Sequence, residues 1–251
     1  MSEPSVALLG YGYWGKNLAR NLHEMGVLKT VCDPSGKARE RFQEQISSVA
    51  VEASMDNVLQ DPNLKAIVLA TPAETHFRLA AEAMRNGKDV FVEKPLALRA
   101  AEGVELCDLA RKLGRILMVG HLLEYHPAVE AMKSLIHKGE LGEVNYIYSN
   151  RLNFGKIRTE ENALWSFAPH DVAVILRLAG GLPESVQCSG GEFLSSGVAD
   201  VTLSSLRFSN NLRAHIFVSW LNPFKEQKLV VTGAERMAVF DDTSTEKLLL
   251  Y

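Results

Sequence analysis

The sequence predicts an α/β protein in which a helix-covered parallel sheet is followed by an α+β domain with a largely antiparallel sheet. Up to residue 120, short β-branched apolar runs alternate with amphipathic segments, which is typical of a parallel sheet with helices on both faces. Beyond Gly120, polar and apolar residues alternate at every second position, which is typical of an antiparallel sheet with one solvent-exposed face. We therefore expect two domains, 1–120 and 121–251, with a cleft between them.

The elements of the first domain follow from this alternation. Strands are predicted at 6–9, 27–32, 49–52, 66–70, 89–92 and 116–119, and helices at 14–25, 36–45, 74–86 and 100–113. In the helix predicted at 74–86, the apolar residues 77, 80, 81 and 84 form one stripe, so we expect that face to lie on the sheet.

The second domain is predicted to combine two helices with several strands. Helices are expected at 127–137 and 169–178, and strands at 144–152, 186–193, 201–208, 212–220, 228–232 and 237–240. Turns are expected at 209–211 and 233–235. The apolar stripe Val174, Leu176 and Leu178 is expected in the core, whereas the alternating residues Ile216, Val218 and Trp220 fit either the interior or an interface between subunits.

The composition is that of a soluble globular protein, with 47% hydrophobic and 23% charged residues among 251. A net charge of −3 with mixed signs gives no basic field for nucleic acid or anionic lipid, so small molecules and other protein chains are the expected partners. Cys32, Cys107 and Cys188 form no CxxC pair, which favours reduced thiols. No apolar run approaches the roughly 20 residues that span a bilayer. Reduced thiols indicate a cytoplasmic location. Because the N-terminus passes almost directly into the first strand, no export signal is expected.

Two other kinds of site are disfavoured. No cluster of His, Cys and carboxylate residues has metal-ligand spacing, so we expect no metal. No Gly-Lys-Ser/Thr follows a glycine loop, which excludes the chemistry of phosphate-loop kinases.

The segment from Gly10 to Gly15 joins the first predicted strand to the first predicted helix and reads GYGYWG. Glycine at 10, 12 and 15 allows a sharp turn and a close approach of the backbone to a pyrophosphate. The helix that follows directs unpaired N–H groups and a partial positive charge at the phosphates. This order predicts a dinucleotide-binding site, with Tyr13 and Trp14 expected to cover the cofactor.

Asp33 closes the second predicted strand and bears on the choice of cofactor. A carboxylate there can accept hydrogen bonds from the ribose hydroxyls of the adenosine half and repels a 2′-phosphate, which favours NAD over NADP. Asp33 could instead cap the helix that follows Pro34, and the nearby Lys37 and Arg39 keep NADP open.

Three further signatures stand at the ends of predicted strands, where doubly wound sheets bind ligands. The fourth strand ends at Thr71-Pro72, with His76 a turn later, the fifth at Glu93-Lys94-Pro95 and the sixth at Gly120-His121. Far along the chain, residues 165–171 read WSFAPHD and begin the main helix of the second domain. Each has a structural alternative: Thr-Pro is a common strand exit, His76 and His170 could cap helices, and Lys94 could be a surface lysine.

Together these motifs resemble the glucose–fructose oxidoreductase, inositol dehydrogenase and rhizopine-catabolism family of nicotinamide-dependent sugar oxidoreductases. The glycine turn, Glu93-Lys94-Pro95 and His170 match the family's motifs in order. The resemblance implies an N-terminal Rossmann domain and a sugar dehydrogenase of the EC 1.1.1 class. It implies cofactor-binding residues Gly10, Gly12, Tyr13, Trp14, Gly15, Asp33, Thr71, Pro72, His76, Glu93 and Lys94. Subunits of the family form dimers or tetramers, so a homodimer or homotetramer is expected.

Residues 148–171 look most like the branch that oxidises nucleotide sugars at C3, such as UDP-N-acetylglucosamine 3-dehydrogenase and its uronate-specific relative, which serve polysaccharide or lipid A synthesis. Two departures stand out. Many members carry Asp four residues before the histidine, where this chain has Ser166, and Asp171 could partly substitute. The sequence ends at Tyr251, whereas members usually continue with a segment that returns a helix to the nucleotide domain, so the second domain is expected to be short at its C-terminus.

The resemblance implies that Lys94 and His170 act as the catalytic pair. Burial and the positive nicotinamide ring both disfavour the ammonium form of Lys94, so we expect it to hydrogen-bond the reacting oxygen while His170 takes up or relays the proton. Which of the two is the formal base stays open.

The residues before His170 are the candidates for substrate binding. Arg151, Lys156 and Arg158 form a cationic cluster that could hold a diphosphate or could be a solvated loop. Asn153, Asn162 and Trp165 could contact the sugar, and Asp171 completes the predicted set. The alternatives are another sugar or cyclitol dehydrogenase, a ketoreductase, or an NAD-binding sensor that has lost catalysis.

Overall fold

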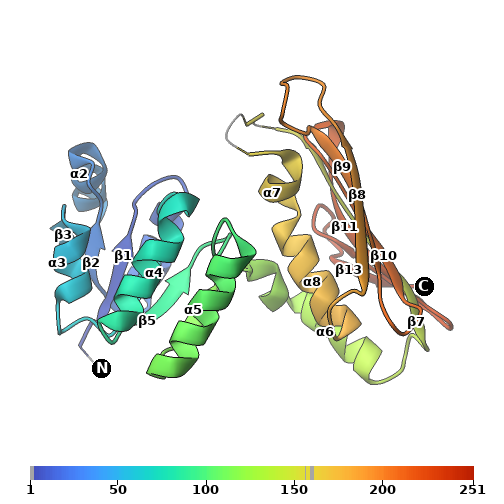
Figure 1. Ribbon diagram of the computed structural model, residues 1–251, viewed down its shortest axis with the longest axis horizontal. Helices are drawn as coiled ribbons and strands as arrows, with labels where there is room; N and C mark the ends of the chain where they lie inside the picture. The colour runs from blue at the N-terminus through green and yellow to red at the C-terminus, as the bar shows by residue number, and fades with distance from the viewer. Residues whose placement is uncertain (1–2, 156, 159–160) are drawn as a thin grey trace. The chain divides into compact units, whose positions relative to one another are not determined.

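The computed structural model describes residues 3–155, 157–158 and 161–251 (Figure 1). The chain divides into two compact units, Met1–Gly120 and His121–Tyr251, called here the N-terminal and C-terminal units. No helix in the described part of the chain is long and apolar enough to cross a membrane.

The N-terminal unit is built on a parallel sheet with the order β3-β2-β1-β4-β5-β6. Its strands are β1 (Val6–Leu9), β2 (Leu28–Cys32), β3 (Ala50–Glu52), β4 (Ala66–Leu69), β5 (Asp89–Val92) and β6 (Leu117–Val119). The helices are α1 (Gly15–Glu24), α2 (Gly36–Gln45), α3 (Met55–Gln60), α4 (His76–Arg85) and α5 (Ala100–Leu113). The strand order reverses between β1 and β4, and ligands of doubly wound sheets bind at the carboxyl ends of the strands beside such a point.

The predicted fold class is confirmed for this unit, with two differences in detail. The short helix α3, capped by the Ser54 side chain, was not predicted. The helix predicted at 74–86 begins as a 3-10 turn, Ala73–Thr75, because Pro72 starts that segment in an extended conformation.

Hydrophobic residues cover both faces of the parallel sheet. Along β1, Ala7 and Leu9 pack in one cluster, whereas Leu8 packs in another with Phe42. This alternation is the two-residue period of a strand buried on both faces. In α4, Ala80 and Met84 are buried in the first cluster, so the predicted stripe does lie on the sheet.

The C-terminal unit is built on a mixed, mostly antiparallel sheet with the order β13-β12-β11-β7-β10-β9-β8, in which β7 and β10 are parallel. Its strands are β7 (Val144–Phe154), β8 (Ser185–Gly191), β9 (Val201–Arg207), β10 (Arg213–Ser219), β11 (Leu221–Gly233), β12 (Met237–Asp241) and β13 (Leu248–Leu250). A 3-10 segment, η2 (Leu122–Tyr125), precedes the helices α6 (Pro127–His137), α7 (Ala163–Phe167) and α8 (Pro169–Ala179). The segments η2, α7 and β13 were not predicted, since each is too short to show a period.

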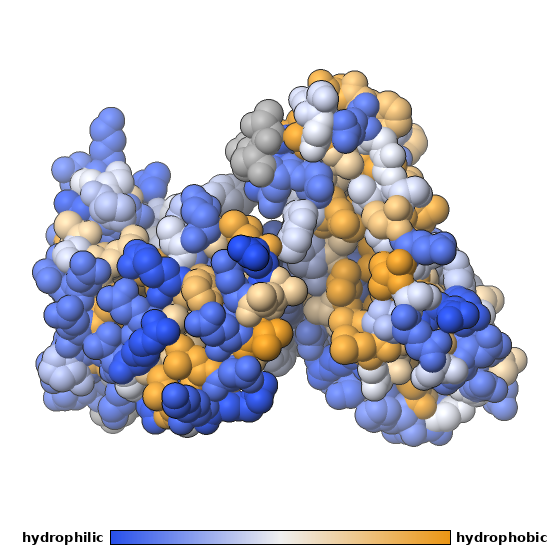
Figure 2. Space-filling view, viewed as in Figure 1, coloured by the Kyte–Doolittle hydropathy of each residue, from blue (hydrophilic) through white to orange (hydrophobic). Residues whose placement is uncertain are grey.

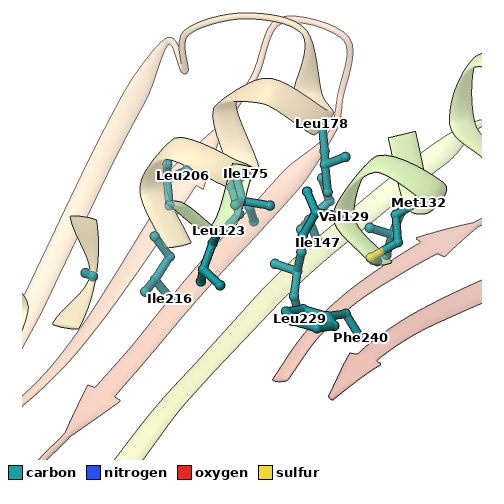
Figure 3. Packing of buried hydrophobic residues seen from close by; sticks show 14 of the residues in the cluster. Leu123, Val129, Met132, Ile147, Ile175, Leu178, Leu206, Ile216, Leu229 and Phe240 are labelled. Atoms are coloured by element: carbon teal, nitrogen blue, oxygen red, sulfur yellow. The ribbon is translucent and has the colours of Figure 1, made fainter. Parts of the chain in front are cut away.

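The helices of the C-terminal unit pack on one face of its sheet, and Figure 3 shows side chains from both layers meeting in a single core. Ile216, Val218 and Trp220 are all at most 1% exposed, so they belong to this interior and the alternative of a subunit interface at these residues is wrong. On β10, His215 and Phe217 alternate with Ile216 and Val218 and point to the opposite, open face of the sheet.

A buried carboxylate organises the loop between β8 and β9, whose tip is hydrophobic in Figure 2. Asp200 is 0% exposed and accepts hydrogen bonds from the indole of Trp220 and from the backbone N–H groups of Phe193 and Leu194. These hydrogen bonds outweigh the effect of burial and lower the pKa of Asp200. The carboxylate therefore fixes a loop that exposes two large apolar side chains.

Candidate active site

The three glycines of the turn after β1 are required for different reasons. Gly10 has φ +95°, and a Cβ there would lie 2.5 Å from the Ala70 carbonyl oxygen. A Cβ at Gly15, the first residue of α1, would lie 2.1 Å from the Gly10 carbonyl oxygen. A Cβ at Gly12 would meet nothing within 4 Å. Internal packing thus explains Gly10 and Gly15, whereas Gly12 keeps clear a space that a bound group, such as a diphosphate, would need.

Asp33 links the end of β2 to this turn. Its Oδ2 accepts a hydrogen bond from the Tyr11 N–H at 2.8 Å, and its Oδ1 accepts one from the Ser35 N–H at 2.9 Å. Arg39 donates to the backbone carbonyl oxygens of Asp33 and Pro34, which places a guanidinium beside the backbone that follows β2. The geometry fits the dinucleotide site predicted from the sequence, with the acidic residue next to the glycine turn.

Glu93 follows β5 and makes a contact with the turn that the sequence did not predict. The Trp14 indole Nε1 donates to Glu93 Oε1 at 2.6 Å, and the Lys94 N–H donates to Glu93 Oε2 at 3.2 Å. Burial raises the pKa of the Glu93 carboxyl, while the hydrogen bond from Trp14 acts in the opposite direction. Tyr13, beside Trp14, is 86% exposed.

His76 lies at the first turn of α4 and is 1% exposed. Its Nδ1 is 2.7 Å from the Pro95 carbonyl oxygen and its Nε2 is 2.9 Å from that of Thr71. Because a carbonyl oxygen can only accept, both hydrogen bonds form together only when both ring nitrogens carry a proton. His76 therefore ties the loop after β4, which includes Pro72, to the loop after β5.

In the C-terminal unit, His170 lies in the first turn of α8, directly after Pro169. The rings of His170 and His121 meet edge to face, with centroids 6.0 Å apart and planes at 89°. Ser166, four residues earlier, is 7% exposed. The structure thus pairs two histidines that stand far apart in the sequence.

Asp171, the next residue of α8, is 4% exposed and anchors the helix to β7. Its carboxylate accepts hydrogen bonds from Arg151 Nε at 2.7 Å and Nη2 at 3.1 Å and from Ser149 Oγ at 2.6 Å. A bidentate guanidinium–carboxylate pair of this kind has strict geometry. Sequence reasoning missed Ser149, although its position two residues before Arg151 on the same strand face was a usable signal. A small cavity beside the pair is lined by Leu123, Val129, Arg151, Asp171, Val174, Gln227, Lys228, Leu229 and Phe240.

The other predicted substrate residues flank the loop between β7 and α7. Arg158 forms an ion pair with Glu161 at 2.8 Å, so both described arginines of the predicted cationic cluster have carboxylate partners. Lys156 lies outside the described residues. Asn153 is partly buried near the end of β7, and Trp165 is 48% exposed on α7, whose first turn is capped by the Asn162 side chain.

Two family models match the chain, one for each unit. Residues 5–121 match the NAD-binding Rossmann fold of the GFO/IDH/MocA oxidoreductases, and residues 129–239 match the C-terminal domain of the same family. The chain belongs to the GFO/IDH/MocA family. The predicted fold, family and NAD cofactor are therefore confirmed.

Members of the family with different activities are similar to this chain. A 2,7-anhydro-N-acetylneuraminate hydratase of Mediterraneibacter gnavus is 28% identical, with 94% of this chain and 66% of that protein covered. A UDP-N-acetylglucosamine 3-dehydrogenase of Acidithiobacillus ferrooxidans is 26% identical, with coverage of 96% and 72%. The chain thus spans about two thirds of the length of such relatives.

Solved structures show the same fold. That of the Acidithiobacillus dehydrogenase has a TM-score of 0.90 at 23% identity and covers 100% of this chain and 81% of its own. The WlbA dehydrogenase of Bordetella pertussis, in complex with NADH and UDP-GlcNAcA, has a TM-score of 0.89 at 21% identity, with coverage of 98% and 76%.

Proposed function

We propose that this protein is an NAD-dependent dehydrogenase that oxidises a secondary alcohol of a sugar, with C3 of a UDP-N-acetylhexosamine or its uronate as the preferred substrate. The observation that carries the proposal is the glycine turn, where Gly12 leaves room that the chain's own packing does not need, beside the carboxylate of Asp33. The similarity to a UDP-sugar dehydrogenase supports the substrate class. Because the chain is also similar to a hydratase of an anhydro sugar, the experiment includes other sugars as alternative substrates.

The N-terminal unit supplies the cofactor site in this proposal. The glycine turn and α1 hold the diphosphate, Asp33 accepts from the adenosine ribose, and Tyr13, Trp14, Thr71 and Pro72 form the walls. Bound NAD supplies the hydride acceptor. Lys94 donates a hydrogen bond to the reacting oxygen of the sugar, and His170 takes up the proton, so that the alcohol is oxidised without a free alkoxide.

The C-terminal unit supplies the substrate residues. Asn153, Arg158 and Trp165 contact the nucleotide sugar. Asp171 already accepts three hydrogen bonds from its own chain, so the pair that it forms with Arg151 acts by holding the start of α8, and with it His170, in place.

The test follows the absorbance of reduced cofactor while the purified protein is incubated with NAD and a panel of UDP-sugars, free hexoses and cyclitols. Lys94→Met and His170→Gln should each lower turnover by about a hundredfold or more, the usual contribution of a positioned acid or base. Lys112→Met, an exposed lysine on α5, is the matched control and should behave as wild type.

Two results would contradict this proposal. Turnover within about tenfold of wild type in Lys94→Met removes the assigned acid–base role. Tight NAD binding without turnover of any sugar points instead to an NAD-binding sensor, for which Ser166, in place of the aspartate of many relatives, is the feature to examine.

The open face of the C-terminal sheet is where we place contact between subunits in a homodimer or homotetramer. Tyr148 and His215 stack there with ring centroids 5.2 Å apart, and Tyr146 hydrogen-bonds His215 Nδ1. Phe217→Glu adds a charge to this face, and we expect it to lower the oligomer mass measured by light scattering. An unchanged mass would place the contact elsewhere.

A further inference from the structure

The carboxylate of Glu93 is held by two segments that are remote from it in the sequence. It accepts a hydrogen bond from the indole N–H of Trp14, which belongs to the glycine turn. On another side it lies against Gly120, where an added Cβ would come 2.9 Å from Oε2 and 3.0 Å from Oε1. The lack of a side chain at the end of β6 therefore makes room for this carboxylate. Because Glu93 also accepts the Lys94 N–H, the turn, β5 and β6 are joined directly before the lysine.

The other neighbour of Lys94 is held as well. The Pro95 carbonyl oxygen faces His76 Nδ1 at 2.7 Å, and His76 is fixed in turn by Thr71. The backbone that carries Lys94 is thus secured on both sides by buried or half-buried polar groups. Lys94 and His76 are also the charged or titratable groups that act on Glu93.

We propose that Glu93 is a positioning residue for Lys94 and that its hydrogen bond with Trp14 couples occupancy of the glycine turn to the placement of the lysine. The inference rests on the proposed function, in which Lys94 meets the reacting oxygen. Trp14 is 41% exposed, so a molecule bound along the turn can contact it, while its indole N–H stays on the carboxylate. A hydrogen bond to an ionised carboxylate is shorter and stronger than a neutral one, which suits a link that must transmit position.

The experiment is a double-mutant cycle with Trp14→Phe, Glu93→Gln and both together. Phenylalanine keeps an aromatic ring but removes the donor, and glutamine keeps the shape but removes the charge. Each single variant should lower kcat about tenfold, since one removes the hydrogen bond to a charged group and the other removes the charge that strengthens it, with the sugar KM within about threefold of wild type. The double variant should be no worse than the more damaged single variant, because both changes act on the same charge-assisted hydrogen bond, Trp14→Phe by removing its donor and Glu93→Gln by removing the charge of its acceptor.

A second readout needs no turnover. The rate at which an acylating reagent modifies Lys94, measured by mass spectrometry across a pH series, reports the protonation of its amine. The midpoint should move to lower pH in Glu93→Gln, because the ammonium loses an adjacent negative charge. Gly120→Ala, which pushes the Glu93 carboxylate away without a change of charge, should lower kcat as Trp14→Phe does. Glu82→Gln, a glutamate paired with Arg78 on the surface of α4, is the control and should change neither readout.

Two results would overturn the positioning role. One is that Trp14→Phe and Glu93→Gln lower kcat independently, so that their effects multiply in the double variant. The other is that the midpoint of Lys94 acylation does not move in Glu93→Gln. These outcomes are separable from failure of the proposed function. If wild-type protein oxidises no sugar while the midpoint of Lys94 acylation moves to lower pH in Glu93→Gln, Glu93 acts on Lys94 and the proposed reaction is wrong. If turnover is normal while the two substitutions act independently, the reaction stands and the coupling does not.

Discussion

The carboxylate of Asp33 reaches back to the glycine turn and accepts the backbone N–H of Tyr11 at 2.8 Å. One carboxylate therefore shapes the turn with Oδ2 and binds the Ser35 N–H with Oδ1, at the place where an adenosine ribose is expected. Loss of Asp33 should weaken cofactor binding in two ways, by removing the ribose acceptor and by releasing the turn.

We predict that Asp33→Ala lowers the affinity for NAD by about tenfold or more, since at least one hydrogen bond to a charged group is lost. Affinity for NADP should fall less, because repulsion of the 2′-phosphate disappears and Arg39 stays nearby. Isothermal titration calorimetry with NAD and with NADP measures the ratio of the two affinities. Asp108→Ala, on the surface of α5, should leave it unchanged, and an equal loss for both cofactors would show that Asp33 acts only on the turn.

Gly12 and Gly15 should respond differently to the same substitution. In Gly15→Ala the new Cβ meets the Gly10 carbonyl oxygen at 2.1 Å, so the backbone must shift, and we expect a loss of about 1–3 kcal/mol in the free energy of unfolding. In Gly12→Ala nothing lies within 4 Å, so stability should change by less than about 0.5 kcal/mol.

For cofactor affinity we expect the opposite order, with the larger loss in Gly12→Ala, because its Cβ occupies the space left for the diphosphate. Urea denaturation and NADH fluorescence titration on the same two proteins give the comparison. Wild-type NADH affinity in a fully stable Gly12→Ala protein would mean that the space at this glycine is not used by the cofactor.

His76 should stabilise the fold in addition to forming part of the candidate site. His76→Phe leaves the carbonyl oxygens of Thr71 and Pro95 without their donor, and we expect a loss of about 1–3 kcal/mol in the free energy of unfolding. His23→Phe, an exposed histidine in the last turn of α1, is the matched control. Equal urea midpoints for the two variants would contradict the role assigned to the imidazole.

Asp200 should make stability depend on pH. Its pKa is lowered in the folded protein by hydrogen bonds from Phe193, Leu194 and Trp220, so the carboxylate contributes stability above the unfolded-state pKa of about 3.9 and loses it as pH falls through the lower folded value. Asp200→Asn should therefore be less stable than wild type at pH 7, and the difference should narrow below about pH 4. Urea midpoints over this range measure it, with Asp108→Asn as control. A difference that stays constant with pH would show that the charge of Asp200 plays no part.

Much of the N-terminal unit was predictable because its signals are local. The strands around Leu8 and Val90 have continuous apolar runs, and the glycine turn is contiguous, so position along the chain was enough to place them. The C-terminal unit was predicted less completely. The helix α7 has five residues and β13 has three, which is too short for a period to appear.

Partners of side chains were the least predictable part of the site. Arg151 was predicted either to help hold a diphosphate or to lie in a solvated loop. In the structure it binds Asp171, because a strand and a helix twenty residues apart bring the two charges together inside the protein. The same holds for Trp14 and Glu93, which are separated by 79 residues and meet only because β1 and β5 both end at the same edge of one parallel sheet.

The amino-acid sequence by itself determined the order of the longer strands and helices, the glycine turn and the family, because periodicity and short motifs depend on neighbouring residues. The tertiary structure alone decided which polar groups satisfy one another: Asp33 with Tyr11, His76 with Pro95, Asp171 with Arg151. Those choices depend on burial, because a polar group removed from water must find its partner among whatever segments the fold places within hydrogen-bonding distance.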